Sequence, residues 1–193
     1  IDNIVNEIVE ELLYEASPEV GPCFYPGKFK PPHKGHFEAA KYLASKDYIN
    51  KVYVIISNVP KYGISPEDSM YIWMEYLKAE PNPKIQVEIS KESTPIKDIF
   101  NFLDKNPDVS PVYVASGEEE QTELGYFDSM QKRFPNRIRP EVIPAQFGRI
   151  SATQMRAALK TGNFEEFAKF VPDSAYNKAV AKDVFGKLLK ILK

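Results

Sequence analysis

The part of the sequence that decides the fold is residues 21–44, which read GPCFYPGKFKPPHKGHFEAAKYLA. The apolar stretch that closes on Gly27 predicts a first β-strand, and the segment from Lys34 to Ser45 predicts a helix with one buried face. The ten residues 27–36 join the two and hold both histidines of the chain and three lysines. A strand that runs through a short loop into a helix is the first unit of an α/β fold.

Strand and helix patterns continue to alternate after this unit. Residues 51–57 are apolar on both faces, which is typical of a central parallel strand covered by helices. Ser65 as N-cap and Pro66 as first helical residue indicate a helix that reaches Lys78. The other expected elements are strands at 85–89, 112–115 and 138–143, and helices at 96–103, around 127–130 and from 151 onward, with breaks at Gly162 and Pro172.

This alternation predicts a doubly wound parallel sheet of about five strands, with ligands at the carboxyl ends of the strands. A chain of 193 residues is long enough for one such domain and short for two. We expect an amphipathic helix at 1–18, the α/β domain at 19–172 and a helical extension at 173–193. We expect the basic last helix to pack on the domain or on a neighbouring subunit of a homo-oligomer. The alternative is a helix that lies on a membrane surface.

Composition narrows the class of function. A net charge of −2 argues against a general nucleic-acid-binding protein, and no apolar run is long enough to cross a membrane. The single cysteine, Cys23, cannot form an intramolecular disulfide, and zinc-ligand spacing is absent, so we expect a packed thiol in the reducing cytoplasm. The polar, acidic start at Ile1 does not suit a secretory signal, and we expect a processed chain or a piece of a longer one.

Positive charge is concentrated in residues 27–36 of a protein that is acidic overall. His33 and His36 lie three apart at the start of a helix, so they project on one side of its first turn. The helix N-terminus adds free N–H groups and a partial positive charge, and Gly35 would let a ligand approach the backbone closely. These features favour a cationic phosphate pocket over a structural histidine beside solvated lysines.

A second segment, residues 150–156, reads ISATQMR. Ser151 is a suitable N-cap, and Thr153 and Arg156 lie three apart on the new helix and therefore share a face. A hydroxyl and a guanidinium near a helix N-terminus can hold triphosphate oxygens. The alternative interpretation is a capped helix with a surface arginine.

These two segments resemble the two motifs of the HxGH nucleotidyltransferase superfamily. Residues 27–36 match GxFxPxHxGH and residues 150–156 match ISxTxxR at every defined position. Residues 64–73 are similar to a segment from a phage-associated branch of that superfamily. The resemblance covers most of residues 21–172, and it implies a Rossmann-like nucleotidyltransferase fold.

The resemblance implies that an acceptor phosphate attacks the α-phosphorus of a nucleoside triphosphate and that pyrophosphate leaves. It assigns His33 and His36 to the α-phosphate and its bridging oxygen, and it places Lys28 on the phosphates. Catalysis would then depend on the positioning of the reacting groups and on neutralisation of the negative charge that grows in the transition state. Mg²⁺ would bind to the triphosphate, with no metal site on the protein. The nucleotide-binding residues that the resemblance implies are Gly27, Phe29, Gly35, Ser116, Gly117, Ser151, Thr153 and Arg156.

The sequence says less about the identity of the nucleoside triphosphate and of the acceptor. Lys30 replaces the Gln or Asp that relatives commonly have, and Lys61 follows the second strand, so both are candidate contacts for the acceptor. The second motif lacks the RTxGxST form of many cytidylyltransferases and favours ATP, whereas Arg149 keeps CTP open. Nicotinamide mononucleotide is the preferred acceptor, and phosphopantetheine, a phospho-alcohol or a sugar phosphate are the alternatives.

Two other functions compete with this one. The first is a nucleotide-binding module that has lost turnover, against which the complete motifs argue. The second is a fragment of a class I aminoacyl-tRNA synthetase, against which the short chain and the absence of a KMSKS-like segment argue. Walker, GxGxxG, HExxH and GxSxG motifs are absent from the sequence.

Overall fold

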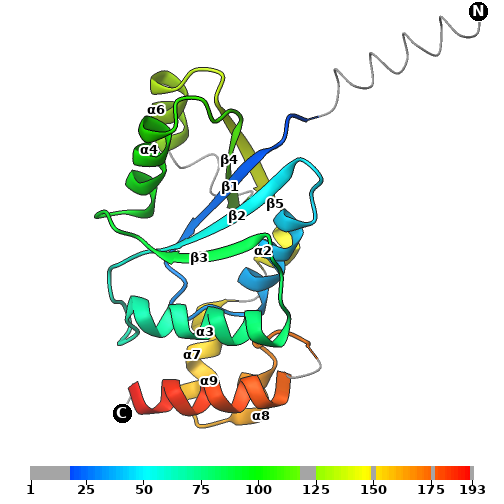
Figure 1. The fold of residues 1–193 in the computed structure, drawn as a ribbon. Helices are drawn as coiled ribbons and strands as arrows, with labels where there is room; N and C mark the ends of the chain where they lie inside the picture. The colour runs from blue at the N-terminus through cyan, green and yellow to red at the C-terminus, as the bar shows by residue number, and fades with distance from the viewer. Residues whose placement is uncertain (1–17, 118–124, 149–150, 175–176, 192–193) are drawn as a thin grey trace, which may run out of the picture.

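The computed structural model describes residues 18–117, 125–148, 151–174 and 177–191, so the expected N-terminal helix lies outside it. The described residues form one parallel sheet in the order β3-β2-β1-β4-β5 (Figure 1). The strands are β1 (Gly21–Gly27), β2 (Ile49–Ile56), β3 (Ile85–Ile89), β4 (Val112–Gly117) and β5 (Ile138–Ile143). This order confirms the doubly wound sheet that the sequence predicts.

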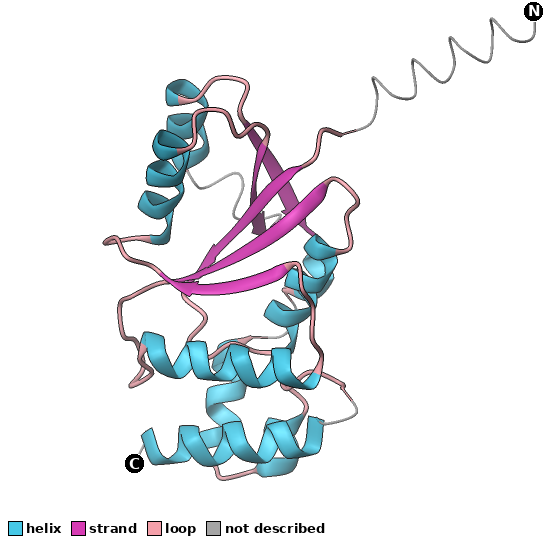
Figure 2. Cartoon of the chain, in the orientation of Figure 1, coloured by secondary structure: helices cyan, strands magenta, loops and turns pink. Residues whose placement is uncertain are grey.

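Helices cover both faces of the sheet (Figure 2). One face carries α4 (Pro95–Lys105) and α6 (Tyr126–Arg133), and the other carries α2 (Lys34–Ala44) and α3 (Pro66–Ala79). Three more helices form a further layer outside α3, namely α7 (Ala152–Lys160), α8 (Phe164–Ala168) and α9 (Asn177–Ile191). A short 3-10 helix, η1 (Ala145–Phe147), follows β5.

Each face of the sheet has its own hydrophobic core, because successive side chains of a strand point to opposite faces. Phe24 and Ile55 belong to the core under α4 and α6. Cys23 and Val54 belong to the core under α2 and α3. Cys23 is fully buried, as expected of a packed thiol, and burial, with a smaller contribution from the charge of Glu141, raises the pKa of that thiol.

β1 is central in the sheet although it contains two prolines, which cannot donate to a strand ladder. It pairs with β2 along its whole length, and its pairing with β4 covers Cys23 and Phe24. Pro22 and Pro26 flank these two residues, so the ladder to β4 is confined to the segment between the prolines. The strand therefore keeps its central place with a short second ladder.

Helix α9 packs on α3, α7 and α8, which confirms the expectation that the last helix packs on the domain. Val184 and Leu188 are fully buried and share one core with the sheet face under α2 and α3. Most of the apolar side of this helix is thus covered by the protein itself. None of the described helices is both long and apolar enough to cross a bilayer.

We predict that Leu188→Ala lowers the free energy of unfolding by about 2–5 kcal/mol, because the buried side chain leaves a cavity. Lys190→Ala, an exposed change on the same helix, should stay within about 0.5 kcal/mol of the parent. Urea unfolding followed by circular dichroism measures both values. A Leu188→Ala midpoint equal to that of the parent would show that α9 contributes nothing to the core.

Candidate functional site: a cationic cleft

A cleft of about 750 Å³ opens at the carboxyl ends of the strands. The loops that follow β1, β2 and β3 line it, together with Ala115 of β4, Tyr126 and the first turns of α7. The connection after β1 leads to α2 on one face, whereas the connection after β4 leads to α6 on the other. The cleft therefore lies at the switch point of the sheet, where doubly wound folds bind ligands.

The charged side chains among the described residues of the cleft are all positive. Its lining includes Lys28, Lys30, Lys61 and Arg156, and none of the described residues that line it is Asp or Glu. The chain as a whole carries a net charge of −2, so this concentration is local. A cleft whose described residues include four cations and no carboxylate is suited to a ligand with several negative charges.

The two histidines cap helix α2 reciprocally. His33 is the N-cap residue, and its Nδ1 accepts a hydrogen bond of 3.4 Å from the backbone N–H of His36. In return, Nδ1 of His36 accepts one of 3.3 Å from the N–H of His33. The rings stack with their centroids 3.6 Å apart. Because both Nδ1 atoms accept, we assign the ring proton of each histidine to Nε2.

Both rings are neutral near pH 7. Burial lowers the pKa of His33 to about 4. Burial, and next the neighbouring His33, lower the pKa of His36 well below its ordinary value. His36 lines the cleft and can offer a neutral Nε2–H, whereas His33 is buried behind it. The positive charge expected of this segment therefore comes from its lysines and not from its histidines.

Phe29 fixes the position of the His36 ring. The backbone of Phe29 is left-handed, with φ at 50°, and its buried ring packs edge-on against His36, Tyr25 and Trp73. A Cβ at Gly27 would lie 2.5 Å from the Phe29 ring, so glycine is needed there. Phe29 also lines the cleft, where it presents little surface.

Gly35 has a different role from the one that the sequence suggests. A Cβ at this position would overlap the backbone oxygen of Phe147, which lies in η1 against α2. The close packing of η1 on the helix therefore requires glycine at this position, and the close ligand approach at its backbone stays a prediction. Gly35 is also absent from the lining of the cleft.

Lys30 is a buried amine at the edge of the cleft, with 3% of its surface exposed. Its Nζ donates to Ser69 Oγ at 3.2 Å, and that hydroxyl donates to the backbone oxygen of Phe29 at 2.8 Å. Burial lowers the pKa of Lys30 to about 8, although Glu67 and Asp68 at the start of α3 act in the opposite direction. The ammonium of Lys30 is thus stabilised by the Ser69 hydroxyl and by the negative charges on α3.

Arg156 joins the two sequence motifs. Its Nη1 donates to the backbone oxygen of Lys30 at 2.7 Å, and its Nη2 donates to Thr153 Oγ1 at 3.0 Å. The guanidinium lies 3.8 Å from the centre of the Tyr62 ring. Thr153 and Arg156 line the cleft, and Ser151 caps α7 by accepting from the N–H of Gln154 at 3.2 Å. Ser151 itself does not line the cleft.

Four other sequence candidates lie in different surroundings. Lys61 lines the cleft, with its Nζ 4.8 Å from the centre of the Tyr62 ring. Ser116 is buried beside the cleft residue Ala115, and its Oγ has no hydrogen-bond partner among the described residues. Gly117 ends β4. Arg149, the residue that kept CTP open, lies outside the described part of the chain.

Several residues of the cleft belong to neither sequence motif, so the motifs do not reveal them. Most of them lie in the loops after β2 and β3. They include Ser57, Val59, Tyr62, Ser93, Thr94 and Ile96. Their signal in the sequence is their place directly after two predicted parallel strands, where ligands of such folds bind. Thr94 followed by Pro95 also marks the start of a helix, and Thr94 caps α4 as that pattern predicts.

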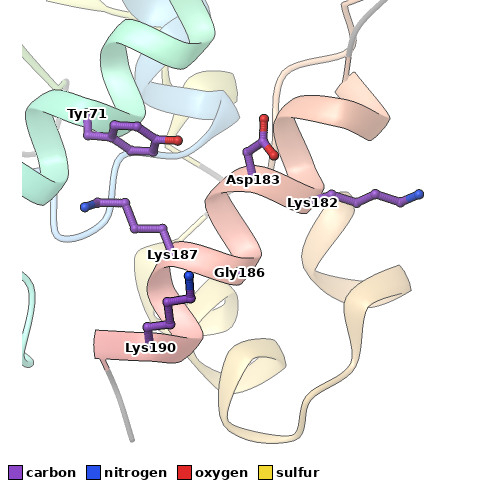
Figure 3. Close-up of a pocket in the computed structure, with 6 residues that line it drawn as sticks. All are labelled: Tyr71, Lys182, Asp183, Gly186, Lys187 and Lys190. Carbon is purple, nitrogen blue, oxygen red and sulfur yellow. The ribbon is translucent and has the colours of Figure 1, made fainter.

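A second hollow, of about 460 Å³, lies between α3 and α9 (Figure 3). Figure 3 shows the Tyr71 ring directed towards Lys187, with Asp183 also on the rim. Lys187 forms an ion pair of 3.1 Å with Asp68 and lies 4.8 Å from the centre of the Tyr71 ring. Carboxylates thus accompany the lysines here, unlike in the cleft at the strand ends.

No protein-family model matches the chain, and no curated protein matches it either. Solved structures match its fold. Nicotinic acid mononucleotide adenylyltransferase from Plasmodium falciparum, complexed with APC, has a TM-score of 0.65 at 13% identity over 90% of this chain and 98% of that one. The same enzyme complexed with NaAD gives 0.61 at 17% identity, with the same coverage.

A third similar structure is a putative nicotinate-nucleotide adenylyltransferase from Vibrio parahaemolyticus. It has a TM-score of 0.60 at 11% identity over 86% of this chain and 95% of that one. This chain has the fold of these adenylyltransferases. Because the identities are low, the likeness establishes the fold, and the activity is argued below from the cleft.

We predict that both imidazoles stay neutral, with the proton on Nε2, through a titration across neutral pH, because burial lowers the pKa of each ring. The chain has two histidines, so a long-range ¹H–¹⁵N NMR spectrum contains two ring systems to follow. Their nitrogen shifts should remain those of the Nε2–H tautomer throughout the titration. A midpoint near pH 6.5 for either ring would contradict the buried, reciprocal cap.

We predict that adenosine 5′-monophosphate, used as a phosphate-bearing probe, binds several-fold more weakly as the pH rises through about 8. Lys30 is charged below its pKa of about 8 and neutral above it, so its attraction for an anion is lost there. Titration calorimetry measures the affinity. Lys30→Met should bind weakly at all pH values and give a flatter profile, while Lys182→Met, an exposed lysine outside the cleft, should follow the parent.

Proposed function

We propose that this protein is a nucleotidyltransferase, which transfers a nucleoside monophosphate from a nucleoside triphosphate to a phosphorylated acceptor and releases pyrophosphate. The observation that supports this most is the cleft at the sheet switch point, with four cationic side chains, the His36 imidazole and no carboxylate among its described residues. The two sequence motifs meet at this cleft through the Arg156–Lys30 hydrogen bond. The shared fold with adenylyltransferases is consistent with the proposal.

We place the triphosphate at the N-terminus of α7. The first-turn N–H groups of a helix lack partners within the helix and favour anions. Thr153 and Arg156 lie at this end and line the cleft, so they would hold the β- and γ-phosphates. Ser151 contributes by capping the helix, which fixes the orientation of that first turn.

We place the α-phosphate beside His36. An oxygen of the acceptor phosphate attacks the α-phosphorus in line, a new P–O bond forms, and the bond to the bridging oxygen of pyrophosphate breaks. The acceptor phosphate is already an anion, so the step needs no general base. The Nε2–H of His36 would donate to an oxygen on which charge increases, and Lys28 would neutralise charge nearby. His33 acts by holding His36 through the reciprocal cap.

We propose that the triphosphate, and not a set of the described residues, carries Mg²⁺. No group of three or more His, Cys, Asp or Glu side chains among them could hold a metal ion, and the described lining of the cleft has no carboxylate. Bound in this way, Mg²⁺ would keep most of its waters.

We favour ATP over CTP, and a mononucleotide such as nicotinamide mononucleotide as the acceptor. The fold neighbours support this choice as adenylyltransferases of nicotinic acid mononucleotide. Lys30 and Lys61 would contact the acceptor phosphate, because both line the part of the cleft formed by loops rather than by α7. A nucleotide-binding module without turnover is the second candidate.

We predict that His36→Asn and His36→Gln differ sharply in the release of pyrophosphate from ATP, Mg²⁺ and a panel of phosphorylated acceptors. The Asn side chain can accept in place of Nδ1 and preserve the cap, but it loses the Nε2–H. The Gln amide reaches roughly the position of Nε2 and can still donate. We expect a loss of about 10²–10³-fold for Asn, in line with the removal of one transition-state donor, and a smaller loss for Gln.

Thermal unfolding provides the structural control, and we expect the Asn variant to remain folded like the parent. Parent-like turnover in His36→Asn would refute the role of this nitrogen. ATP binding without pyrophosphate release from any acceptor in the panel would favour the binding module instead.

A further inference from the structure

The hollow between α3 and α9 is separate from the cleft. None of the described residues that line it also lines the cleft, and the function proposed above leaves it without a role. Tyr71 of α3 forms one wall with a partly exposed ring, and α9 forms the floor and the other wall (Figure 3). Its volume of about 460 Å³ lies in the range of small-molecule sites.

Gly186, on the floor of this hollow, is a glycine that the packing of α9 does not require. It lies inside the helix Asn177–Ile191, where glycine is less stable than alanine. Apart from its chain neighbours and the backbone of its own helix, a Cβ at this position would meet no described atom within 4 Å. At Gly35, by contrast, a Cβ would overlap the backbone oxygen of Phe147. The missing side chain of Gly186 therefore serves to keep the hollow open.

Two lysines of α9 stand beside this open floor. Lys187 and Lys190 lie three apart and share a face of the helix. Figure 3 shows Lys187 directed towards the Tyr71 ring and Lys190 directed towards the turn that holds Gly186, whereas Lys182 points away from both. Lys190 is exposed and forms no ion pair with another described residue. Two ammonium groups beside an open floor are suited to a group with two negative charges.

The carboxylates near these lysines leave room for such a group. Asp68 Oδ1 pairs with Lys187 at 3.1 Å, whereas its Oδ2 accepts from the Ser65 N–H at 3.0 Å and caps α3. Because the cap uses the second oxygen, Lys187 can turn from Asp68 to an incoming anion while α3 stays capped. Asp183 is exposed on the rim, and Figure 3 shows its carboxylate directed away from Lys187 and Lys190.

We propose that the hollow between α3 and α9 binds a phosphate group, which Lys187 and Lys190 contact above Gly186. The ligand is free phosphate or a compact phosphate ester, with Tyr71 as the wall beside it. This site does not depend on the function proposed for the cleft. A membrane surface is the other partner of a basic helix, but it needs apolar side chains that face outward, and Val184 and Leu188 are fully buried.

The test follows the backbone amides of Gly186 and Tyr71 by ¹H–¹⁵N NMR while inorganic phosphate is added at constant ionic strength. In the parent both should shift and saturate. Lys187→Met and Lys190→Met should each weaken the affinity about tenfold, as expected for one charge-assisted hydrogen bond. Lys132→Met, an exposed lysine of α6, is the matched control and should bind like the parent.

Asp68→Asn should act in the opposite direction and strengthen phosphate binding several-fold. Lys187 then loses its carboxylate partner, whereas the Asn side-chain oxygen can still accept from Ser65 and cap the helix. Gly186→Leu should unfold at a temperature no lower than the parent, because leucine favours the helix and open space lies at its Cβ. Its side chain fills the floor and should abolish the saturable shift at Tyr71.

Phenyl phosphate, an aromatic ester, distinguishes the two sources of the phosphate group. Tighter binding than inorganic phosphate assigns the site to an ester that packs on Tyr71, and equal binding assigns it to free phosphate. A shift that does not saturate in the parent, or equal affinities in the parent, Lys190→Met and Gly186→Leu, would overturn the inference. Binding to phosphatidylserine vesicles without saturable phosphate binding would overturn it in favour of a membrane surface.

Discussion

The cleft depends on the hydrogen bond from Arg156 to the backbone oxygen of Lys30. It joins residues 126 positions apart in the chain, and at 2.7 Å it is a short, charge-assisted bond. Through it, the first turns of α7 are fixed against the loop between β1 and α2. The side chain of the same Lys30 reaches α3 through Ser69, so three elements meet at one loop residue. The bond thus joins the two motifs directly at the cleft.

The same arrangement explains how the protein tolerates four cations in one cleft. The surroundings of three of these cations limit their mutual repulsion. Lys30 is buried, and Glu67 and Asp68 on α3 favour its charged form from a distance. Arg156 is stacked on Tyr62, and Lys61 lies over the same ring. The acidic groups stand behind the cleft wall, so they favour the charged lysine without occupying the space of an anionic ligand.

Much of the fold and part of the site follow from local patterns. Ser65 and Ser151 were predictable as helix N-caps because capping depends on side chains within one turn. The motif residues Lys28, His36 and Arg156 come together as expected because they stand at strand ends and helix starts of a parallel sheet. β2 begins at Ile49, two residues earlier than predicted, since its pairing with Gly21 is a long-range contact that no local pattern encodes.

The unpredicted features depend on contacts between distant segments. Gly35 is constrained by η1, which lies more than a hundred residues later in the chain, so its sequence motif alone suggested a ligand. Tyr62 has a positive φ and contacts Arg156, and the periodicity of the sequence reveals neither feature.

The charge state of the histidines is the clearest example of a property set by tertiary structure. Two rings with centroids 3.6 Å apart, largely removed from water, cannot both carry charge at reasonable cost, so the stack is stable in the neutral form. Their reciprocal cap then uses both Nδ1 atoms and leaves the Nε2–H atoms as donors. In this cleft the lysines and Arg156 therefore supply positive charge. His36 supplies a neutral hydrogen-bond donor of fixed orientation. A donor that does not titrate near neutral pH keeps its direction and its proton while the charge of a ligand changes beside it.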